Sequence, residues 1–351
     1  MSRRQGASPV RVGIIGCGRI ANSHVQAVAA SAEAELAALI DPVQERSAAL
    51  ISKYGLRAAS YPSVADALPH IDAAVIATPN HLHADVAVEC ISAGIPVLIE
   101  KPLAASLADG LRITEAASAT GVVVAVGYVT RFTESNQLMR DLLRRDAFGR
   151  IRRFAYQFGT RGGWAPLSAY NLDRNAAGGG VLVVTGTHFL DRMLDWFGYP
   201  VRAELRDDSE GGPEANAVAT FTFDHPAGPV EGSARFSKTV ALEAGIVLDT
   251  DAGTVLLRDK PGAEVVIRSQ ATPNIETTVR GRTAGRRTAR AGEFVLQLQD
   301  FIAAIQTGAQ PMVSGQSALA SLRLLEELYQ HRQRLYEDHY AQQVVAEGVA
   351  R

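Results

Sequence analysis

GIIGCGRIANSH, residues 13–24, places small residues in the spacing G-x-G-x-x-A between an apolar strand and a predicted helix. Gly16 permits a tight turn after the strand, and Gly18 lets the backbone approach a pyrophosphate group closely. Ala21 allows the helix to pack closely on the strand, because its side chain is a single methyl group. The stretch therefore predicts a strand–turn–helix unit that binds the phosphates of a dinucleotide.

Features close to this turn indicate which dinucleotide would bind. We expect the first N–H groups of the helix, at Arg19 and Ile20, to face the pyrophosphate, since helix N-termini attract anions. Asp41 ends the next predicted strand, about 20 positions on, where an acidic side chain holds a ribose diol. Its charge would repel a 2′-phosphate, so we predict NAD as the cofactor. Arg46 lies nearby in the sequence and leaves NADP as the alternative.

The pattern of strands and helices up to residue 130 sets the fold class of the first part of the chain. Short apolar runs rich in β-branched residues alternate with helical stretches, which is typical of a doubly wound, mostly parallel sheet. The predicted strands are residues 10–16, 35–41, 73–79, 96–102 and 122–128, with helices near 19–31, 82–93 and 106–120 and one that runs up to Tyr54. We therefore expect an α/β dinucleotide-binding domain over residues 10–129, preceded by a flexible arm at residues 1–9.

Beyond residue 130 the pattern changes, because short polar turns rather than helices join the strands. The predicted strands are residues 151–159, 217–223, 228–236, 244–250, 253–259 and 263–269, and the helices are about 180–197, 293–307 and 315–337. We expect a large, mostly antiparallel sheet in an α+β substrate-binding and oligomerisation domain over residues 130–351. So few helices cannot cover both faces of this sheet, and an open apolar face predicts a homo-oligomer.

The composition argues against several classes of partner. The chain has 351 residues, of which 47% are hydrophobic and 21% charged, as in a globular protein. Its net charge is −2, so we expect no general electrostatic attraction to nucleic acid or to anionic membranes. No apolar run approaches the roughly 20 residues that span a bilayer. The N-terminal MSRRQGASPV has no apolar stretch of signal-peptide length, and two cysteines predict no disulfide framework. We expect a cytoplasmic protein without nucleic-acid or membrane partners.

A polar turn follows the third predicted strand. Since loops at the carboxyl ends of parallel strands line the cofactor crevice, we expect Thr78, Pro79 and Asn80 to contact the cofactor. His81 and His83 suggest a metal, but no acidic or cysteine partner stands at ligand spacing, so we predict no metal site. An N-capping turn, in which His83 contacts the cofactor or solvent, is the preferred interpretation.

The run VLIEKPLAAS, residues 97–106, ends a buried strand with a charged pair and a proline. By the same rule, Glu100 and Lys101 fall at the carboxyl end of that strand, over the nicotinamide position, and become candidate cofactor contacts. The bond from Lys101 to Pro102 can adopt cis at modest cost, which would turn the chain and aim the lysine inward. The alternative is a Glu–Lys surface pair that closes the strand.

Four stretches follow one another in this order: GIIGCGRIANSH, ATPNHLHADVA, EKPLA and GGGVLVVTGTHFLDRMLDWFG, with EFVLQLQDFIAAIQTG fitting near the end. Together they resemble the glucose–fructose oxidoreductase / inositol dehydrogenase / rhizopine catabolism (Gfo/Idh/MocA) family, from Val10 to about Arg334. The resemblance implies a Rossmann domain followed by an open-faced α/β domain that forms homodimers or homotetramers through its open sheet. It also implies hydride transfer between a nicotinamide and a hydroxyl or keto carbon of a sugar, cyclitol or nucleotide-linked sugar. The family lysine maps onto Lys101, as a proton relay and substrate-hydroxyl contact.

The glycine-led stretch GGGVLVVTGTHFLD keeps one residue that the family implies and lacks another. His188 is present and is the natural general acid/base, because histidine titrates near neutrality. The family commonly has an Asp four residues earlier, where this chain has Val184. On a helix Val184 would lie beside His188, and it can neither bond a substrate hydroxyl nor support imidazole protonation. Asp191 or Thr185 could orient the histidine instead, and a buried structural histidine is the alternative.

The substrate pocket should come from loops of the second domain that face the nicotinamide. Polar side chains that could bind hydroxyl groups, and aromatic side chains that could form one wall of the pocket, precede the glycine-led helix or lie on it. One further residue follows the strand at 122–128 and is similar to a family position near the active site. These candidate substrate contacts are Arg131, Arg161, Trp164, Tyr170, Asn171, Arg174 and Thr185. A structural role is the alternative for each of them.

Three functions are compatible with these residues. The leading prediction is an NAD-dependent oxidoreductase acting on a sugar or polyol, in which Lys101 and His188 handle the hydroxyl proton. A second is an NAD-dependent lyase or hydrolase that moves the hydride only transiently. A third is a non-catalytic, dinucleotide-dependent sugar-sensing regulator. The presence of both Lys101 and His188 argues against the regulator, whereas Val184 favours it.

Overall fold

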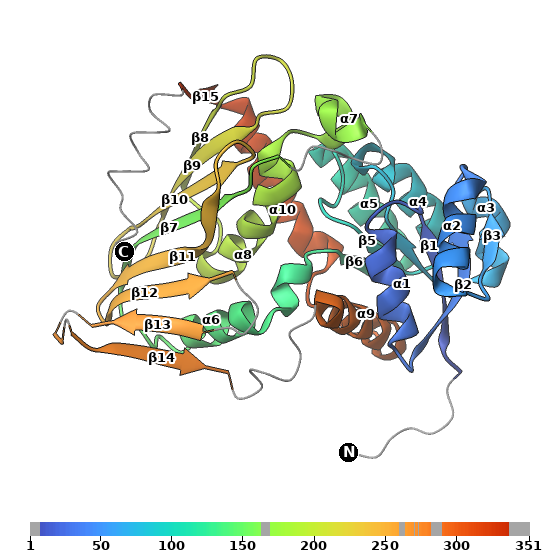
Figure 1. Cartoon of the computed structure of the whole chain (residues 1–351), viewed down its shortest axis with the longest axis horizontal. Helices are drawn as coiled ribbons and strands as arrows, with labels where there is room; N and C mark the ends of the chain where they lie inside the picture. The colour runs from blue at the N-terminus through green and yellow to red at the C-terminus, as the bar shows by residue number, and fades with distance from the viewer. Residues whose placement is uncertain are drawn as a thin grey trace. The chain divides into compact units, whose positions relative to one another are not determined.

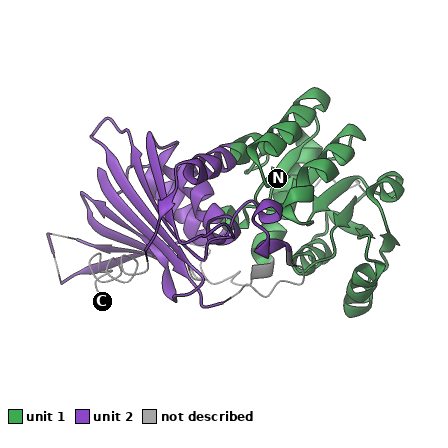
Figure 2. Cartoon of the chain, turned by 90° about the horizontal axis from the view of Figure 1, so that it is seen from above, with its two compact units in different colours: residues 1–132, 289–319 green, residues 133–288, 320–351 purple. Residues whose placement is uncertain are grey.

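The computed structural model describes residues 8–162, 169–259, 264–269, 271–272, 274–281 and 290–336. The chain divides into two compact units, residues 1–132 with 289–319 and residues 133–288 with 320–351 (Figure 2). The chain first passes from one unit to the other at residue 132, close to the boundary expected near residue 130. The sequence pattern, however, places residues 289–319 in the second domain, whereas in the structure they belong to the first unit. The difference has a packing cause: Phe294 and Phe301 of this segment are buried in the hydrophobic core of the first unit, together with Val25.

In the described part of the chain, the first unit contains a six-stranded parallel sheet in the order β3-β2-β1-β4-β5-β6 (Figure 1). Its strands are β1 (Val10–Ile15), β2 (Ala34–Ile40), β3 (Ala59–Tyr61), β4 (Ala73–Ile76), β5 (Val97–Ile99) and β6 (Val124–Val126). The strand order reverses between β1 and β4, and α/β folds bind ligands at the carboxyl ends of the strands beside such a reversal. The predicted doubly wound parallel sheet is confirmed. The short strand β3 is an addition, since three residues are too few to show an apolar pattern.

Six described helices belong to the first unit. They are α1 (Ala21–Ala29), α2 (Gln44–Tyr54), α3 (Val64–Ala67), α4 (His83–Ser92), α5 (Leu107–Thr120) and α9 (Arg290–Thr307). Local signals set their ends: Ser106 caps α5 by accepting a hydrogen bond from the Asp109 N–H, and Gly121 ends it in the left-handed conformation. Helix α9 packs against α1, the helix that follows the glycine turn.

The described residues of the second unit form a nine-stranded sheet in the order β14-β13-β12-β11-β7-β10-β9-β8-β15 (Figure 1). Its strands are β7 (Ile151–Gly159), β8 (Arg202–Asp207), β9 (Asn216–Phe223), β10 (Val230–Ser237), β11 (Leu242–Thr250), β12 (Gly253–Arg258), β13 (Glu264–Arg268), β14 (Glu276–Arg280) and β15 (Gln333–Arg334). The sheet is mostly antiparallel, as predicted, but β7 pairs with β10 and β8 with β15 in parallel. Strands β8 and β14 are additions, because their sequences RAELRD and ETTVR are mostly polar.

The described helices of this unit are α6 (Glu134–Arg144), α7 (Arg174–Ala177), α8 (Thr187–Phe197) and α10 (Gly315–Gln330), although α10 begins within the residues of the first unit. Two helix predictions are corrected. The helix expected over about 180–197 is a π-helix, Leu182–Gly186, that continues as α8. The helix expected to reach residue 337 ends at Gln330, and strand β15 follows it.

Helices α6 and α8 lie on the same face of the nine-stranded sheet (Figure 1). Aromatic side chains join α8 to the sheet: Phe189 stacks on Tyr156 of β7 with ring centroids 4.0 Å apart, and Phe197 stacks on Phe154 at 4.8 Å. The aromatic cluster fixes the helix that carries His188, because stacked rings bury a large apolar area in a specific geometry.

Candidate active site

The glycine turn after β1 leaves open space beside its backbone. Gly16 has φ 93°, and a Cβ there would lie 2.7 Å from backbone atoms of Ala77, so the turn passes directly over the end of β4. At Gly18, by contrast, a Cβ would meet no atom within 4 Å. Arg19 is exposed and Ile20 is half-buried where the turn leads into α1. The cradle fits the pyrophosphate of a dinucleotide, which needs close approach to a bare backbone.

Asp41 follows β2 directly, and only 3% of its surface is exposed. Its Oδ2 accepts a hydrogen bond from the Cys17 N–H (2.9 Å), and its Oδ1 accepts one from the Val43 N–H (2.8 Å). The carboxylate is thereby fixed beside the glycine turn, and each oxygen keeps a lone pair for a further donor such as a ribose hydroxyl. Arg46 Nη1 lies 3.8 Å from Asp41 Oδ1. Arg46, which would favour NADP, is therefore paired with Asp41, which would favour NAD.

The loop after β4 presents a hydroxyl that lacks a partner among the described residues. Thr78 is half-buried, and its Oγ1 is buried without a hydrogen bond. Pro79 is half-buried and Asn80, which begins the 3-10 turn Asn80–Leu82, is buried. Because buried hydroxyls are almost always hydrogen-bonded, Thr78 Oγ1 fits a site for a polar group of a ligand.

His83 lies inside the first unit, which corrects the prediction that it faces cofactor or solvent. Its side chain is fully buried, with Nδ1 3.0 Å from Pro102 O and Nε2 3.1 Å from Thr78 O. Burial lowers the pKa of His83, although the two carbonyl contacts and the charge of Glu100 act in the opposite direction. The first turn of α4 points the ring inward, so His83 bridges the loops after β4 and β5. His81 is the exposed histidine of the turn.

Glu100 and Lys101 follow β5 directly, and the Lys101–Pro102 peptide bond is cis. Glu100 is buried: Oε1 lies 2.7 Å from Nε2 of His24 on α1, and Oε2 accepts a hydrogen bond from the Lys101 N–H at 3.2 Å. Burial alone would raise the pKa of Glu100, but the His24 hydrogen bond and the charges of His24 and Lys101 hold it below its ordinary value. Lys101 itself is half-buried. A buried, internally bonded Glu100 does not fit the alternative of a Glu–Lys surface pair.

The predicted cofactor residues of the first unit lie along one edge of its sheet. Successive contacts link the loops after β2, β1, β4 and β5: Asp41 with Cys17, Gly16 with Ala77, and His83 with both neighbouring loops. Arg131 is half-buried in the 3-10 turn after β6. The carboxyl edge of a parallel sheet is where α/β folds bind ligands.

In the second unit, the π-helix and the start of α8 combine buried and partly exposed residues. The partly exposed ones are Val184, Thr185 and His188. π-helical turns are rare and are frequent at functional sites. Of the two residues expected to orient His188, Asp191 is fully buried and accepts a hydrogen bond from Ser321 of α10 at 3.4 Å, whereas Thr185 is partly exposed.

The glycine run before the π-helix is held by Glu214, a fully buried residue that sequence reasoning missed. Its Oε2 accepts the Gly180 N–H (2.8 Å), and its Oε1 accepts both the Leu182 N–H (2.9 Å) and the Tyr329 hydroxyl (2.7 Å). A Cβ on Gly180 would overlap the backbone of Glu214, so glycine is required there. Burial raises the pKa of Glu214, although these hydrogen bonds lower it. No motif marks Glu214, which lies in the loop between β8 and β9.

A second missed group supports α8 one turn beyond His188. Arg192 is buried and donates from Nη1 to Asp259 Oδ1 and to Asn136 Oδ1, both at 2.8 Å. The Tyr156 hydroxyl donates to Asp259 Oδ2 at 2.9 Å. Burial raises the pKa of Asp259, but the charge of Arg192 outweighs it and holds the pKa low. The network ties α8 to α6, to β7 and to the end of β12.

The remaining substrate candidates of the second unit lie in separate places. Arg161 is exposed after β7, and Tyr170 and Asn171 are half-buried in the 3-10 turn Ala169–Leu172. The Arg174 guanidinium lies over the ring of Tyr329, 5.1 Å from its centroid, so a packing role accounts for part of this side chain. Trp164 lies outside the described residues.

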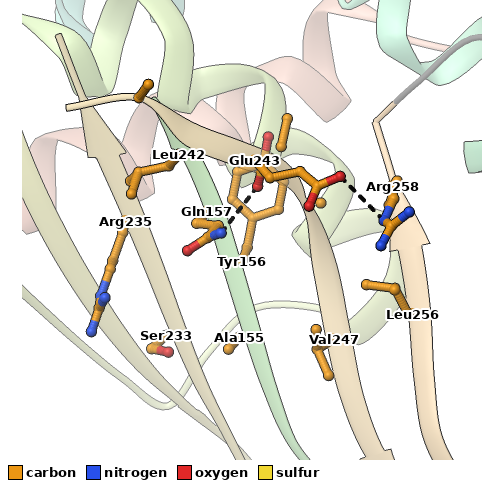
Figure 3. Close-up of a pocket in the computed structure, with 13 residues that line it drawn as sticks. Ala155, Tyr156, Gln157, Ser233, Arg235, Leu242, Glu243, Val247, Leu256 and Arg258 are labelled. Atoms are coloured by element: carbon orange, nitrogen blue, oxygen red, sulfur yellow. Dashed lines mark hydrogen bonds and ion pairs between the residues drawn. The ribbon is translucent and has the colours of Figure 1, made fainter. Parts of the chain in front are cut away.

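A pocket of about 300 Å³ lies on strands β7, β10, β11 and β12 (Figure 3). On one side Gln157 Nε2 donates to the Glu243 carbonyl (3.1 Å), and Arg258 Nε lies 3.3 Å from Glu243 Oε1. Val247 and Leu256 provide apolar surface. No predicted site residue lines this pocket, which belongs to the face of the second sheet.

Within the described ranges, no three His, Cys, Asp or Glu side chains converge as metal ligands would. In the same ranges, no helix combines the length and the apolar character needed to cross a membrane.

Two family models match the chain. "Oxidoreductase family, NAD-binding Rossmann fold" matches residues 10–128, and "Oxidoreductase family, C-terminal alpha/beta domain" matches residues 140–334. Levoglucosan dehydrogenase, solved in complex with NADH and levoglucosan, superimposes with a TM-score of 0.83 at 20% identity, covering 92% of this chain and 97% of that chain. That likeness shows a shared fold.

Curated proteins align over shorter regions. Inositol 2-dehydrogenase 1 of Saccharopolyspora erythraea is 37% identical over 144 residues, which are 40% of this chain and 43% of its own length. The 1,5-anhydro-D-fructose reductase of Ensifer adhaerens is 32% identical over 222 residues, 62% of this chain and 61% of its own length. The chain thus spans less than two thirds of either relative. The two family models, however, cover most of the chain, which belongs to the Gfo/Idh/MocA oxidoreductase family.

Proposed function

We propose that the protein is an NAD-dependent oxidoreductase that transfers hydride between nicotinamide C4 and a hydroxyl or keto carbon of a sugar, cyclitol or nucleotide-linked sugar. One observation carries the proposal: the cradle of Gly16 and Gly18, the carboxylate of Asp41 and the strand-end Lys101 lie along one carboxyl edge. The substrate class is supported by the names of similar proteins, an inositol dehydrogenase, an anhydrofructose reductase and a levoglucosan dehydrogenase.

The chain's own residues would bind the substrate hydroxyl and handle its proton. When bound, the nicotinamide supplies or accepts the hydride. Lys101 is half-buried at the end of β5 and brings three N–H donors on a flexible stem, which suits contact with a hydroxyl and proton relay. His188 is partly exposed on α8 and acts as general acid/base, because histidine exchanges protons near neutral pH.

Asp41 sets the preference for NAD over NADP in this proposal. Its buried carboxylate is fixed by two backbone N–H groups, so it cannot swing away from a 2′-phosphate. The unpartnered Thr78 hydroxyl, the backbone at Gly18 and the loop through Pro79 and Asn80 would hold other parts of the dinucleotide.

Polar residues that are partly or fully exposed would contact the substrate. Those described are Arg131, Arg161, Tyr170, Asn171, Arg174 and Thr185. Trp164 stays a candidate from the sequence. Arg174 is the weakest of the set, because its guanidinium already packs on Tyr329.

One observation favours a second candidate function, a dinucleotide-dependent binding protein without turnover. Val184 is partly exposed near His188 and supplies no carboxylate at the position where the family commonly has one. Turnover separates the two candidates, because a binding protein would bind NAD and a sugar without changing the redox state of either.

We also propose a homodimer or homotetramer through the open face of the nine-stranded sheet. Val247, Leu256 and Val266 are paired across β11, β12 and β13 and are all partly exposed, so they form an apolar row. Helices α6 and α8 lie against the other face. Cys17 and Cys90 are both free and buried, which supports a reducing, cytoplasmic location.

The test of the proposed function is a turnover screen with the whole chain. Purified protein is mixed with NAD or NADP and a panel of cyclitols, aldoses, anhydrosugars and nucleotide-linked sugars, and reduced nicotinamide is followed by its absorbance. We expect net NAD reduction, or NADH oxidation by the matching keto compound, with at least one member. Saturable NAD binding without net turnover on a full panel would favour the second candidate, and product analysis would reveal a transient-redox lyase or hydrolase.

A further inference from the structure

His24 is a buried histidine to which the proposed chemistry gives no role. It lies on α1, the helix that follows the glycine turn, and only 2% of its surface is exposed. Its Nε2 lies 2.7 Å from Glu100 Oε1. Its ring packs edge-to-face with Phe294 of α9, with centroids 5.2 Å apart and planes at 90°. Close packing on α9 fixes the ring, so the nitrogen that faces Glu100 is held in place.

The carboxylate of Glu100 joins His24 to the backbone of Lys101. While Oε1 faces His24, Oε2 accepts the Lys101 N–H at 3.2 Å. The end of β6 closes the other side: a Cβ on Gly127 would lie 3.0 Å from Glu100 Oε2 and 3.0 Å from its Cα. The carboxylate therefore occupies a narrow gap, in an orientation that satisfies both hydrogen bonds.

The charge state of Glu100 determines which of the two side chains, His24 or Glu100, donates the hydrogen bond. The pKa of Glu100 is lowered despite its burial, so the carboxylate is ionised and only accepts hydrogen bonds. His24 therefore donates from Nε2, and the bond is charge-assisted. Without the His24 donor, the buried carboxylate would be stabilised by pairing with another positive charge. The nearest candidate is Lys101, whose charge already lowers the pKa of Glu100.

We propose that His24 is a positioning residue for Lys101: by holding Glu100, it fixes the strand end from which the lysine projects and keeps the carboxylate from capturing the ammonium group. This inference rests on the proposed role of Lys101 as the group that handles the substrate proton. It adds a functional role to α1, the helix that follows the glycine turn.

Two substitutions separate positioning from plain packing. His24→Leu removes the donor and keeps apolar bulk, whereas His24→Gln keeps an amide donor at similar reach. Because a small misplacement of a reacting group can cost about 100-fold, we expect kcat to fall about 10- to 100-fold in His24→Leu and to recover most of this in His24→Gln. NADH affinity should change by less than about three-fold, because the proposed pyrophosphate and ribose contacts at Gly18 and Asp41 lie on other loops.

The pair His24→Leu and Lys101→Ala tests whether the effect passes through the lysine. If it does, His24→Leu costs nothing further in the Lys101→Ala background, whereas a separate structural role would add its full loss there. Gly127→Ala presses on Glu100 from the opposite side and should lower kcat in the same way, so it serves if His24→Leu fails to fold.

A readout that needs no substrate keeps this inference distinct from the proposed function. The acetylation rate of Lys101 by acetic anhydride is measured by mass spectrometry, with the exposed Lys53 as internal reference. We expect Lys101 to react several-fold more slowly in His24→Leu than in the wild type, because the released Glu100 pairs with its ammonium group. Unchanged Lys101 labelling in folded His24→Leu would overturn the inference. A wild-type rate in Lys101→Ala would instead overturn the proposed role of the lysine.

Discussion

The hydroxyl of Tyr329 donates a hydrogen bond to Glu214 Oε1 over 2.7 Å, and both residues are part of the support beneath the helix that carries His188. The same carboxylate accepts the backbone N–H groups of Gly180 and Leu182, at the start of the π-helix. Free N–H groups at a helix start need acceptors, and here a side chain from a distant loop supplies them. The geometry of Thr185 and His188 therefore depends on a buried contact far from both in the sequence.

Tyr329→Phe tests this dependence. The substitution leaves a buried carboxylate short of one donor, so we expect the free energy of unfolding to fall by about 1–3 kcal/mol, together with a lower kcat. Chemical denaturation and steady-state kinetics measure the two effects. Tyr199→Phe is the matched control, because the Tyr199 hydroxyl bonds to Glu327 in an exposed position and should cost less than about 0.5 kcal/mol. Equal losses in the two variants would contradict the assigned role of Glu214.

Asp41→Ala should weaken NAD binding and relax discrimination against NADP. Loss of a charged acceptor for a ribose hydroxyl is worth about 1.5–3 kcal/mol, so we expect roughly 10- to 100-fold weaker NADH binding by fluorescence titration. Adding Arg46→Ala should remove any NADP binding that Asp41→Ala gains. Asp72→Ala alters an exposed ion pair with Arg11 and should leave both affinities unchanged. Tighter binding of NADP than of NAD by the wild type would refute the ribose assignment.

Because His83 is buried, we expect the protein to lose stability in mild acid. Its folded-state pKa is lowered, so the unfolded chain binds more protons as pH falls below about 6.5, and the stabilising contribution of neutral His83 is lost from there down towards the folded pKa. The melting temperature of the wild type should drop between about pH 7.5 and pH 5.5 by more than that of His83→Gln, which cannot titrate. His81→Gln, at the exposed neighbour, should retain the wild-type dependence. An identical pH dependence in wild type and His83→Gln would contradict this account.

The proposed oligomer interface on the open sheet face can be tested by a single substitution. Leu256→Arg places a charge in the apolar row with Val247 and Val266, so we expect light scattering at micromolar concentration to show the proposed oligomer for the wild type and a smaller species for the variant. Leu111→Arg, on an exposed part of α5, should not change the mass. A wild-type protein that stays monomeric at higher concentration would rule out this interface.

Much of the fold follows from local patterns in the sequence. The β-branched runs ending at Ile15, Ile76 and Ile99 have too few polar residues to lie at a surface, and helices alternate with them, which dictates a parallel sheet. The same logic places Asp41 and Lys101 at the carboxyl edge, because Asp41 directly follows the strand ending at Ile40 and Lys101 lies two residues after Ile99.

The parts that could not be predicted depend on contacts between distant residues. His24 lies within the glycine motif, yet its partner Glu100 is 76 residues away, so no local spacing reveals the pair. Glu214 reaches Gly180 across 34 residues. Helix α9 returns to the first unit because Phe294 and Phe301 complete its core, which sequence order alone does not indicate.

The central claim is that Lys101 and His188 both act on the proton of one substrate hydroxyl. On a substrate found in the turnover screen, general acid/base help is typically worth about 10²–10⁴-fold, so Lys101→Ala and His188→Ala should each lose roughly that in kcat/KM. NADH affinity, measured in parallel, should change little in either variant. Residues that act as a unit are non-additive, so the double variant should be little worse than the poorer single variant.

The most direct measurement is therefore kcat/KM for the wild type, both single variants and the double variant on one confirmed substrate. The account predicts large single losses without a further large loss in the double variant. Near-wild-type rates in both single variants would contradict it, and would leave Lys101 as a charge at the end of a strand.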